Sequence, residues 1–434
     1  MFPLVILAER TCELGFSQIV NQSYTAQSTT ATQRGAKKYM LCGIKDSMKP
    51  ISNIVIPDLK FELNAGITKL DVALTDIKLA NLNVQDVAFN LFENRSQIAV
   101  LNCSVLINFQ WSFQQQSYPY VVDKGSGKII VNNGELKGDA GSEVDPECPG
   151  HLKVSISGAQ ISYESVNIVI DGGDTWLFQS IINIFQAIVE DELAKSLSKV
   201  LLEAFVKLLN NVFEDGRRFL DYTNHYNIIK DERYTTGIQA KDGAISLLFT
   251  GYIYARRNLT DDYVTPQMLN KVTYNKFNND MQISIHESAI NNAFYTFHKY
   301  ENVYSSATYQ VTQAPKITFY NAAAILEMQV KVNNSLVDLE LIAHLQHENN
   351  MQEQRAYVFF TFQKYSAQTA DESIDISYIE DEVVNHMNSV IKFACYQLSY
   401  THLTELNDYT HMFDPVERVI RLVGPEEYEC KGAR

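Results

Sequence analysis

The sequence lacks any uninterrupted run of about 18 apolar residues, the length that a helix needs to cross a bilayer, so we expect no membrane-spanning helix. Cations are also few: 36 Lys and Arg stand against 51 Asp and Glu, which gives a net charge of −15. Binding to nucleic acid depends on clustered cations that neutralise phosphates, so we expect no nucleic-acid partner. The same shortage of cations disfavours strong attraction to anionic lipid.

Signatures of catalysis and of metal binding are missing as well. The chain contains no G-x-S-x-G elbow, Walker loop, H-E-x-x-H, EF-hand loop or G-x-G-x-x-G. Its closest histidine pair, His344 and His347, falls on a predicted strand, where positions three apart point to opposite faces. We therefore predict no enzyme activity, no metal and no cofactor.

Proline (10) and glycine (19) are modest in number, whereas tyrosine (24) and phenylalanine (22) are plentiful. That balance favours a β-rich fold with long strands and amphipathic helices. With 434 residues, 46% of them apolar, the chain is long enough for two domains or one large elongated unit.

Alternation of apolar and polar residues with a period of two predicts strands. In the first half it covers residues 67–84, 97–111, 127–138 and 151–170, with phase shifts in the first that indicate a bent strand. In the second half it covers residues 243–256, 280–285, 316–332, 336–347 and 357–364. Between them, residues 139–149 read as a surface loop, the Gly125-Ser-Gly127 segment as a hairpin tip, and residues 215–233 as a polar linker.

Helical spacing of apolar residues predicts four helices. The strongest pattern runs over residues 175–213, about 50 Å if straight, and the others cover residues 287–300 and 379–401. A looser pattern covers residues 13–48, although the Ser/Thr run at 28–32 and Gly35 form helices poorly and need tertiary packing. Each half of the chain thus runs through strands and then a helix, which predicts two curved-sheet-plus-helix units in tandem.

The N-terminal segment, residues 1–8, has the apolar character of a signal peptide but no basic residue before it, so a signal remnant and a buried segment both remain open. Six cysteines allow three disulfides or six buried thiols, and none forms a C-x-x-C pair. Five N-x-S/T triplets offer glycosylation candidates, although such triplets also arise by chance. They lie at Asn21, Asn94, Asn102, Asn258 and Asn333.

Five segments resemble, in the right order, the family of bactericidal/permeability-increasing protein, lipopolysaccharide-binding protein and the plasma lipid transfer proteins. Residues 172–185 (GGDTWLFQSIINIF) resemble the entry to the long helix of that family's first barrel, and residues 56–60 (IPDLK) its strand entry. Residues 283–294 (ISIHESAINNAF) resemble the start of its second barrel. Residues 317–320 (ITFY) and 332–336 (VNNSL) follow in the expected order. The resemblance covers nearly the whole chain.

The resemblance implies an α+β fold shaped as an elongated two-barrel boomerang. Each barrel would be a highly twisted antiparallel sheet wrapped on a long amphipathic helix, and a central sheet would join the two. We place an N-terminal lipid-binding barrel with its N-terminal helix at residues 1–225 and a C-terminal lipid-binding barrel at residues 226–434. A curved sheet around an amphipathic helix leaves an elongated apolar slot, and acyl chains gain ~0.8 kcal/mol per buried CH₂ there.

The function that follows is non-catalytic binding or transfer of phospholipid-like ligands in two apolar slots. The lining residues expected for the first slot are Phe16, Ile19, Val20, Leu177, Ile181, Ile184 and Ile188, and those for the second slot are Ile290, Phe294, Phe297, Met387 and Ile391. An ordinary core filled by protein side chains is the alternative explanation of both helix stripes. A scaffold or interaction protein with structural lipid is the alternative function, and an endotoxin-binding defence protein is a third.

The segment that matches the endotoxin-binding tip is aromatic and neutral here, with only Lys124 and Lys128 beyond it, which argues against lipopolysaccharide binding. Aromatic rings with polar handles suit the bilayer interface, so we predict peripheral membrane contact through this tip. The residues concerned are Trp111, Phe113, Tyr118 and Tyr120. Packing of the same rings between hairpin strands is the alternative.

Relatives in this family mostly work outside the cell, so the resemblance implies a secreted protein or one in a secretory lumen, where disulfides form. Cys148 matches a half-cystine of the family, and Cys103 is the partner we favour, because both lie on or beside strands of the first barrel. Cys12 and Cys42 would be held roughly 45 Å apart by a continuous helix and should not pair. Cys395 and Cys430 could pair only if the tail folds back.

Overall fold

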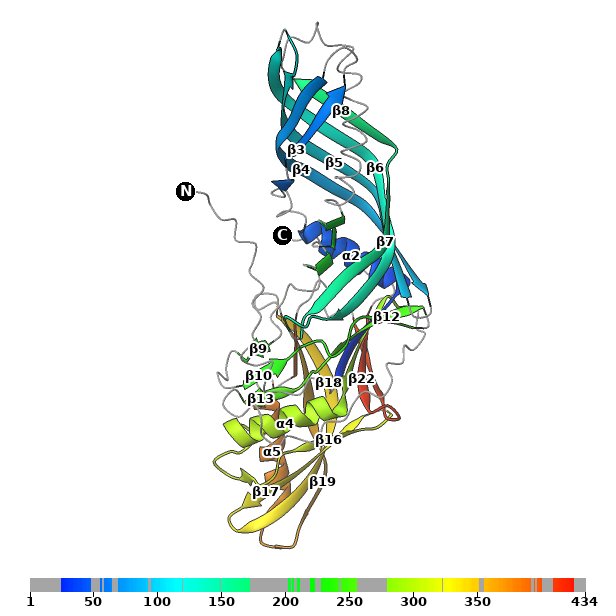
Figure 1. Ribbon diagram of the computed structural model, residues 1–434. Coiled ribbons are helices and arrows are strands. Elements are labelled where there is room, and N and C mark those ends of the chain that lie inside the picture. The colour runs from blue at the N-terminus through cyan, green and yellow to red at the C-terminus, as the bar shows by residue number, and fades with distance from the viewer. Residues whose placement is uncertain are drawn as a thin grey trace.

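The computed structural model describes most of the chain, namely residues 25–47, 55–56, 58–64, 69–92, 95–118, 120–148, 150–171, 202–203, 205–206, 209–210, 219–222, 228–241, 243–255, 279–321, 323–350, 355–391, 394, 396–399 and 409–424. Within these residues the protein is mostly sheet with few helices. It is elongated, with a large curled sheet at one end and a second sheet with two helices at the other (Figure 1).

The curled sheet has seven strands, all antiparallel, in the order β2-β4-β5-β6-β7, with β3 also pairing β4 and β8 also pairing β6. Its strands are β2 (Val55–Ile56), β3 (Leu59–Asn64), β4 (Lys69–Phe92), β5 (Arg95–Gln115), β6 (Val122–Val144), β7 (Leu152–Ser162) and β8 (Ser165–Asp171). Register shifts at Thr75/Lys78 and Leu79/Asn81 interrupt the pairing of β4 with β5. These bulges bend the long strands, so the predicted bent strand is confirmed.

The central sheet is built from distant parts of the chain, in the order β11-β12-β1-β14-β22-β21. Its strands are β1 (Gln27–Thr32), β11 (Gln239–Lys241), β12 (Ala244–Phe249), β14 (Met281–His286), β21 (Thr410–Asp414) and β22 (Val419–Val423). A three-stranded sheet beside it contains β9 (Phe219–Asp221), β10 (Ile228–Asp231) and β13 (Ile253–Ala255).

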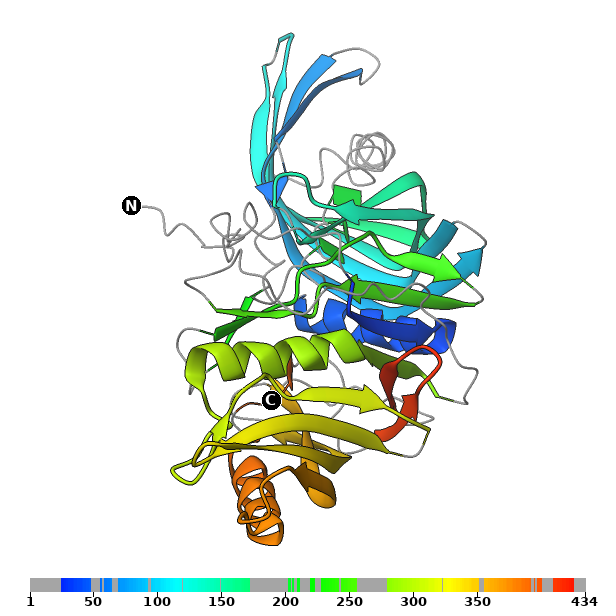
Figure 2. The same cartoon turned by 90° about the horizontal axis from the view of Figure 1, so that it is seen from below.

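The sheet at the far end follows the order β15-β17-β18-β19-β20, with β16 also pairing β17. Its strands are β15 (Gln310–Val311), β16 (Lys316–Phe319), β17 (Ala324–Val332), β18 (Ser335–Asn350), β19 (Arg355–Thr369) and β20 (Tyr396–Ser399). The helices are α2 (Gln33–Ser47), α4 (Glu287–Glu301) and α5 (Ile376–Val390). Seen from below, α4 lies across the middle of the molecule and α5 at its outer edge (Figure 2).

Two apolar cores meet at the central sheet. On β14, Met281 belongs to the core inside the curled sheet, whereas Ile283 and Ile285 belong to the core beneath α4 and α5. These three residues share one face of the strand, because side chains alternate. A single sheet face therefore contributes to both cores.

Several sequence predictions need correction. Residues 28–32 are not helical, because β1 pairs with β12 on one side and β14 on the other, and α2 begins at Gln33; residues 13–24 of the predicted helix lie outside the described part. Residues 139–144 are not loop but the end of β6, paired with β7. The predicted helix over 379–401 ends at Val390, and β20 follows. Gly125 and Gly127 lie within β6 rather than at a hairpin tip, and the predicted strand over 151–170 is two strands.

The predicted polar linker contains the buried strand β10, whose charged residues are paired rather than solvated. Lys230 Nζ lies 2.6 Å from Glu232 Oε1, and Arg233 donates to Asp231. All four side chains are at most 3% exposed. Buried charges are tolerated when they are paired and hydrogen-bonded, so the polar composition of this segment did not mean exposure to solvent.

Candidate functional site

The inner face of the curled sheet is apolar from its far end to the central sheet. Alternate residues of its long strands point inward and are buried, since period-two patterning puts one set on one face. The inward set includes Leu70, Val72 and Leu74 of β4, Phe109, Trp111 and Phe113 of β5, and Ile129 and Val131 of β6. The predicted alternation therefore gives the curled sheet one continuous buried apolar face, which we call the apolar trough.

Both edges of this trough are only half-buried. On one side Leu59 and Phe61 of β3 pack against the core, and on the other side Ile161, Ile168 and Ile170 of β7 and β8 do so. The apolar face therefore extends to the strands at the two edges of the sheet. An acyl chain could gain burial against such a face.

Two glycines of β6 allow aromatic rings to lie flat against the sheet. A Cβ at Gly127 would lie 2.7 Å from Cε2 of Phe109, and a Cβ at Gly125 would lie 2.8 Å from Cε2 of Trp111. Trp111 Nε1 donates to the carbonyl of Ser126 over 3.0 Å, which satisfies the only polar atom of that ring. The sequence contains both the Gly-Ser-Gly segment and the aromatic residues. That Gly125 pairs with Trp111 and Gly127 with Phe109 is known only from the strand register.

At the other end of the molecule, the five residues predicted to line the second slot lie in one apolar cluster. Ile290, Phe294 and Phe297 come from α4, whereas Met387 comes from α5 and Ile391 follows it. All five are at most 3% exposed. Helix α4 matches the predicted helix closely, beginning at Glu287 after the N-cap residue His286.

Most residues predicted for the first slot lie outside the described part of the chain. These are Phe16, Ile19, Val20, Leu177, Ile181, Ile184 and Ile188. From the predicted long helix, Phe205 and Leu209 are described; both are helical and buried in the core of the curled sheet.

The aromatic tip divides into two parts. Trp111 and Phe113 share a face, as predicted, but they are 7% and 8% exposed, with stacked rings inside the trough. Tyr118 and Tyr120, in the connection between β5 and β6, are 85% and 61% exposed. Direct insertion of Trp111 and Phe113 into a membrane is therefore wrong for this conformation, because strand pairing turns both rings inward.

The predicted disulfide between Cys103 and Cys148 is also wrong. Cys103 is a free thiol, and burial raises its pKa to about 11. Cys103 faces Gly134 on β6, which continues ten residues to Val144 before the loop that holds Cys148. At ~3.3 Å per residue, that stretch of strand separates Cys103 from the loop along the chain. Cys148 and Cys42 are disulfide-bonded, so Cys148 has another partner.

Two of the glycosylation candidates are described, and both are exposed residues with left-handed backbone. Asn102 has φ of 53° at a bulge of β5, and Asn333 has φ of 55° in the turn between β17 and β18. Asn21, Asn94 and Asn258 lie outside the described residues.

Sequence reasoning missed a set of asparagines that tie helices to strand edges. Asn210, Asn291 and Asn388 each bond both backbone groups of a single strand residue, their partners being Val154, Ile317 and Phe362 respectively. The side-chain amide thus replaces a neighbouring strand, which satisfies groups that would otherwise be orphaned. Asparagine on an apolar helix stripe is the signal that could have revealed them.

Two kinds of feature are absent from the described residues. Among them, no three His, Cys, Asp or Glu side chains gather as a metal site. No helix in the described part of the chain has both the length and the hydropathy to span a bilayer.

The fold and the trough define an elongated, mostly β protein in which helices and a curled sheet enclose apolar interior. Residues 24–212 match the model of the LBP / BPI / CETP family, N-terminal domain. This match confirms the resemblance seen in the sequence.

A BPI/LBP family protein of Arabidopsis thaliana is 26% identical over 141 residues, which is 32% of this chain and 26% of the relative. The match thus spans about a quarter of that relative's length. The crystal structure of lipopolysaccharide binding protein matches 92% of this chain and 98% of its own, with a TM-score of 0.57 and 14% identity. That likeness shows the fold. Takeout 1 of Epiphyas postvittana covers 42% of this chain at a TM-score of 0.29 and 13% identity, too low to carry an argument.

Proposed function

We propose that this protein binds lipids without catalysis and carries them between membranes or carriers. The observation that supports this most is the apolar trough of the curled sheet, which reaches the half-buried edges formed by β3, β7 and β8. Each CH₂ of an acyl chain buried there would contribute ~0.8 kcal/mol. The match to the family model over residues 24–212 supports the same function.

The architecture we propose for this function is the two-barrel boomerang. Residues 1–225 would form the N-terminal barrel and residues 226–434 the C-terminal barrel, with the central sheet between them. The two separate apolar cores that meet on β14 support this division. The first slot would be lined by the residues predicted in both helices of the N-terminal half, and the second by the cluster around Phe294, Phe297 and Met387.

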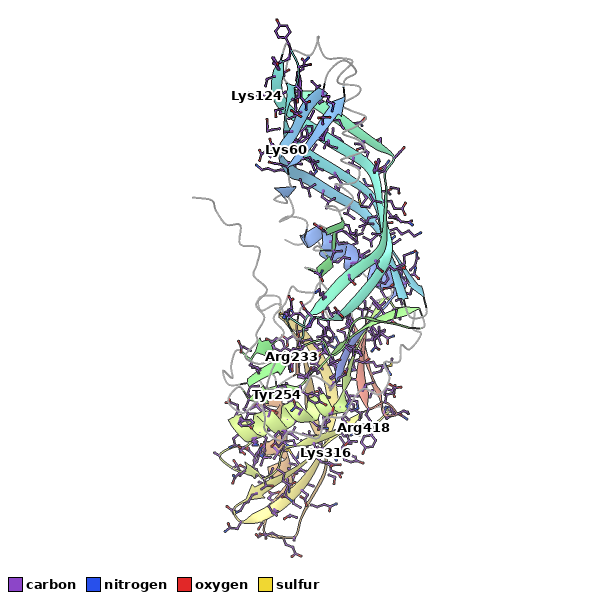
Figure 3. All side chains as sticks on the ribbon, viewed as in Figure 1. Lys60, Lys124, Arg233, Tyr254, Lys316 and Arg418 are labelled. Atoms are coloured by element: carbon purple, nitrogen blue, oxygen red, sulfur yellow. The ribbon has the colours of Figure 1, made fainter. Side chains whose placement is uncertain are left out.

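The ligands we propose are phospholipid-like, and the protein acts without a metal or cofactor. Endotoxin binding is less well supported, because the exposed end of the curled sheet carries Tyr118 and Tyr120 rather than a dense cation cluster. The cations Lys60 and Lys124 lie near that end of the curled sheet (Figure 3). We propose that the two tyrosines make peripheral contact with a membrane.

We further propose that the protein works outside the cell or in a secretory lumen, with glycans at Asn102 and Asn333. Both side chains are exposed on turns or bulges, where a glycan would not disturb packing. The disulfide-bonded state of Cys42 and Cys148 is consistent with that compartment.

Organic extraction of the natively purified protein, followed by mass spectrometry, tests the proposal. We expect co-purified lipid with at least one acyl chain, and transfer of labelled phospholipid between donor and acceptor vesicles. Lipid that is present but never exchanges would favour the scaffold function. Protein that is free of lipid and does not take it up from vesicles would contradict lipid binding altogether.

A further inference from the structure

Helices α4 and α5 have the same length but very different attachments. Each has 15 residues, yet ten residues of α4 are buried, compared with three of α5. The three are Ile379, Val383 and Met387, and they form a single stripe over the far-end core. Helix α5 packs against β19 and β18, at the outer edge of the molecule (Figure 2). It therefore covers the core rather than forming its centre.

Helices α4 and α5 also differ in the number of strands to which their side chains hydrogen-bond. Helix α4 holds two strands, since Asn291 bonds both backbone groups of Ile317 while Asn292 and Thr296 bond those of Ile253. Helix α5 holds one strand residue: Asn388 accepts from the Phe362 amide over 2.8 Å and donates to its carbonyl over 3.1 Å.

The C-terminal half of α5 is the fixed half. Asn388 lies two residues before its end, and His386 Nε2 is 3.0 Å from the carbonyl oxygen of Val303 on the opposite side. The chain then enters β20, where buried Tyr396 donates to Gln27 Oε1 over 2.9 Å or to the Gly251 carbonyl over 2.7 Å. Motion of this end would break a buried polar network.

The N-terminal half packs Ile379 and Val383 into the core, and its polar tie to β19 among the described residues is the exposed Lys364. Lys364 Nζ lies 2.7 Å from Asp381 Oδ1 and 3.3 Å from the Ser377 carbonyl, with side chains of Lys364 and Asp381 36% and 62% exposed. Exposed ion pairs contribute little to stability in water and are screened by salt. This contact, called here the latch, is therefore a weak polar attachment, and burial of Ile379 and Val383 supplies the rest.

We propose that α5 is a hinged lid over the second apolar slot, opening at its N-terminal end about a pivot formed by Asn388 and Phe362. The inference rests on the proposed lipid-binding function. Opening breaks the Lys364 latch and lifts Ile379 and Val383 out of the core. An acyl chain then enters between α5 and β19, along the inner face of β19.

The partner of the open lid is a phospholipid membrane. Tyr365 directly follows Lys364 and Tyr378 directly follows Ser377, so an exposed tyrosine lies beside each end of the latch. The two residues are 60% and 52% exposed. Tyrosine combines an apolar ring with a polar tip and favours the bilayer interface. Tyr365 and Tyr378, on the two sides of the proposed entrance between α5 and β19, are thus suited to contact a bilayer.

Hydrogen exchange of the lipid-free protein measures the opening without reference to any ligand. Amides of residues 376–383 should exchange at least tenfold faster than those of residues 290–297 in α4. The Lys364→Met variant, which keeps the aliphatic stem, should exchange faster still in α5, whereas Lys331→Met on the same sheet should change nothing. Equal protection of the two helices would overturn the lid.

Uptake of fluorescent phosphatidylcholine from neutral vesicles tests the entrance. In a Cys103→Ser background, Lys364→Cys and Asp381→Cys are joined by a bismaleimide, and protein without the two new cysteines receives the same treatment. Closing the lid should remove one kinetic phase of uptake, and Tyr365→Ser with Tyr378→Ser should slow that phase several-fold. Uptake unchanged by the cross-link overturns the lid but leaves lipid binding intact. Absence of uptake by the untreated protein as well would instead count against the proposed function.

Discussion

Gly150 and Arg233 are in direct contact across the junction of the two halves of the protein. A Cβ placed on Gly150 would lie 2.6 Å from Cδ of Arg233, and Gly150 has φ of 93°. Tyr234 donates its amide to the Gly150 carbonyl over 2.9 Å. Arg233 is fully buried and lies in the middle of the molecule (Figure 3). The loop between β6 and β7 of the curled sheet is thereby fixed to the chain that follows β10.

The first prediction concerns this contact. Gly150→Ala should lower the free energy of unfolding by about 2–4 kcal/mol, because the added methyl group collides with Arg233 and the backbone is strained. Gly158→Ala is the matched control: Gly158 also has positive φ, but a Cβ placed on it would meet nothing within 4 Å. It should lose only about 1 kcal/mol. Urea unfolding of both variants checks the difference, and equal losses would contradict the contact.

A second prediction concerns pH. Burial, together with the charge of Arg418, lowers the pKa of His286 to about 4 from 6.5. Between pH 6.5 and pH 4, His286 is protonated in the unfolded chain but neutral in the folded protein. The free energy of unfolding therefore falls as the pH drops from 6.5 to 4. The loss attributable to this residue is roughly 3 kcal/mol.

His286→Asn removes the titration while keeping an N-cap acceptor for α4, whose Ser288 amide donates to His286 Nδ1. The difference in unfolding free energy between pH 7 and pH 4 should shrink in this variant. Asn385→Leu, at an exposed and uncharged position on α5, is the control and should leave the pH profile unchanged. Identical profiles for wild type and His286→Asn would show that the ring is not neutral in the folded state.

A third prediction concerns the helix-to-strand asparagines. Asn291→Leu leaves the amide and carbonyl of Ile317 without partners inside the core, which should cost about 2–4 kcal/mol. Asn385→Leu, an exposed position on α5, should change stability by less than about 0.5 kcal/mol. Thermal unfolding of both variants decides the matter. Comparable transition temperatures for Asn291→Leu and the wild type would show that the hydrogen bonds from Asn291 to Ile317 do not stabilise the fold.

A fourth prediction concerns the exposed tyrosines between β5 and β6. The double variant Tyr118→Ser, Tyr120→Ser should weaken co-sedimentation with neutral phospholipid vesicles about tenfold, if each ring contributes about 0.7 kcal/mol. Binding of the wild type should survive raised salt, because ring burial is not screened as ion pairs are. Tyr163→Ser, in the turn between β7 and β8, is the control. Binding that requires anionic lipid and disappears at high salt would contradict this contact.

The long strands were predictable because their inner faces are buried along almost their whole length. The alternation from Leu70 to Leu74, for example, follows directly from a sheet with one apolar face. The helix at 287–300 was equally clear, because its apolar stripe faces the core. Sequence patterns are informative wherever local propensity and tertiary burial favour the same structure.

The sequence predictions were wrong where residues distant in the sequence determine the local structure. The Ser/Thr-rich β1 is a strand because β12 and β14, more than 200 residues away, pair with it. The run from Lys230 to Arg233 is buried because its charges neutralise one another and Lys230 also reaches Gln27. Trp111 points inward because of register, which a single sequence does not reveal.

Native mass spectrometry of the intact protein, sprayed from non-denaturing buffer after incubation with phosphatidylcholine vesicles and repurification, tests lipid binding most directly. Two slots predict species heavier than the polypeptide by one and two phospholipid masses, and the added mass should disappear on denaturation. A spectrum that shows the polypeptide mass alone, from protein whose fold is intact by circular dichroism, would contradict the account.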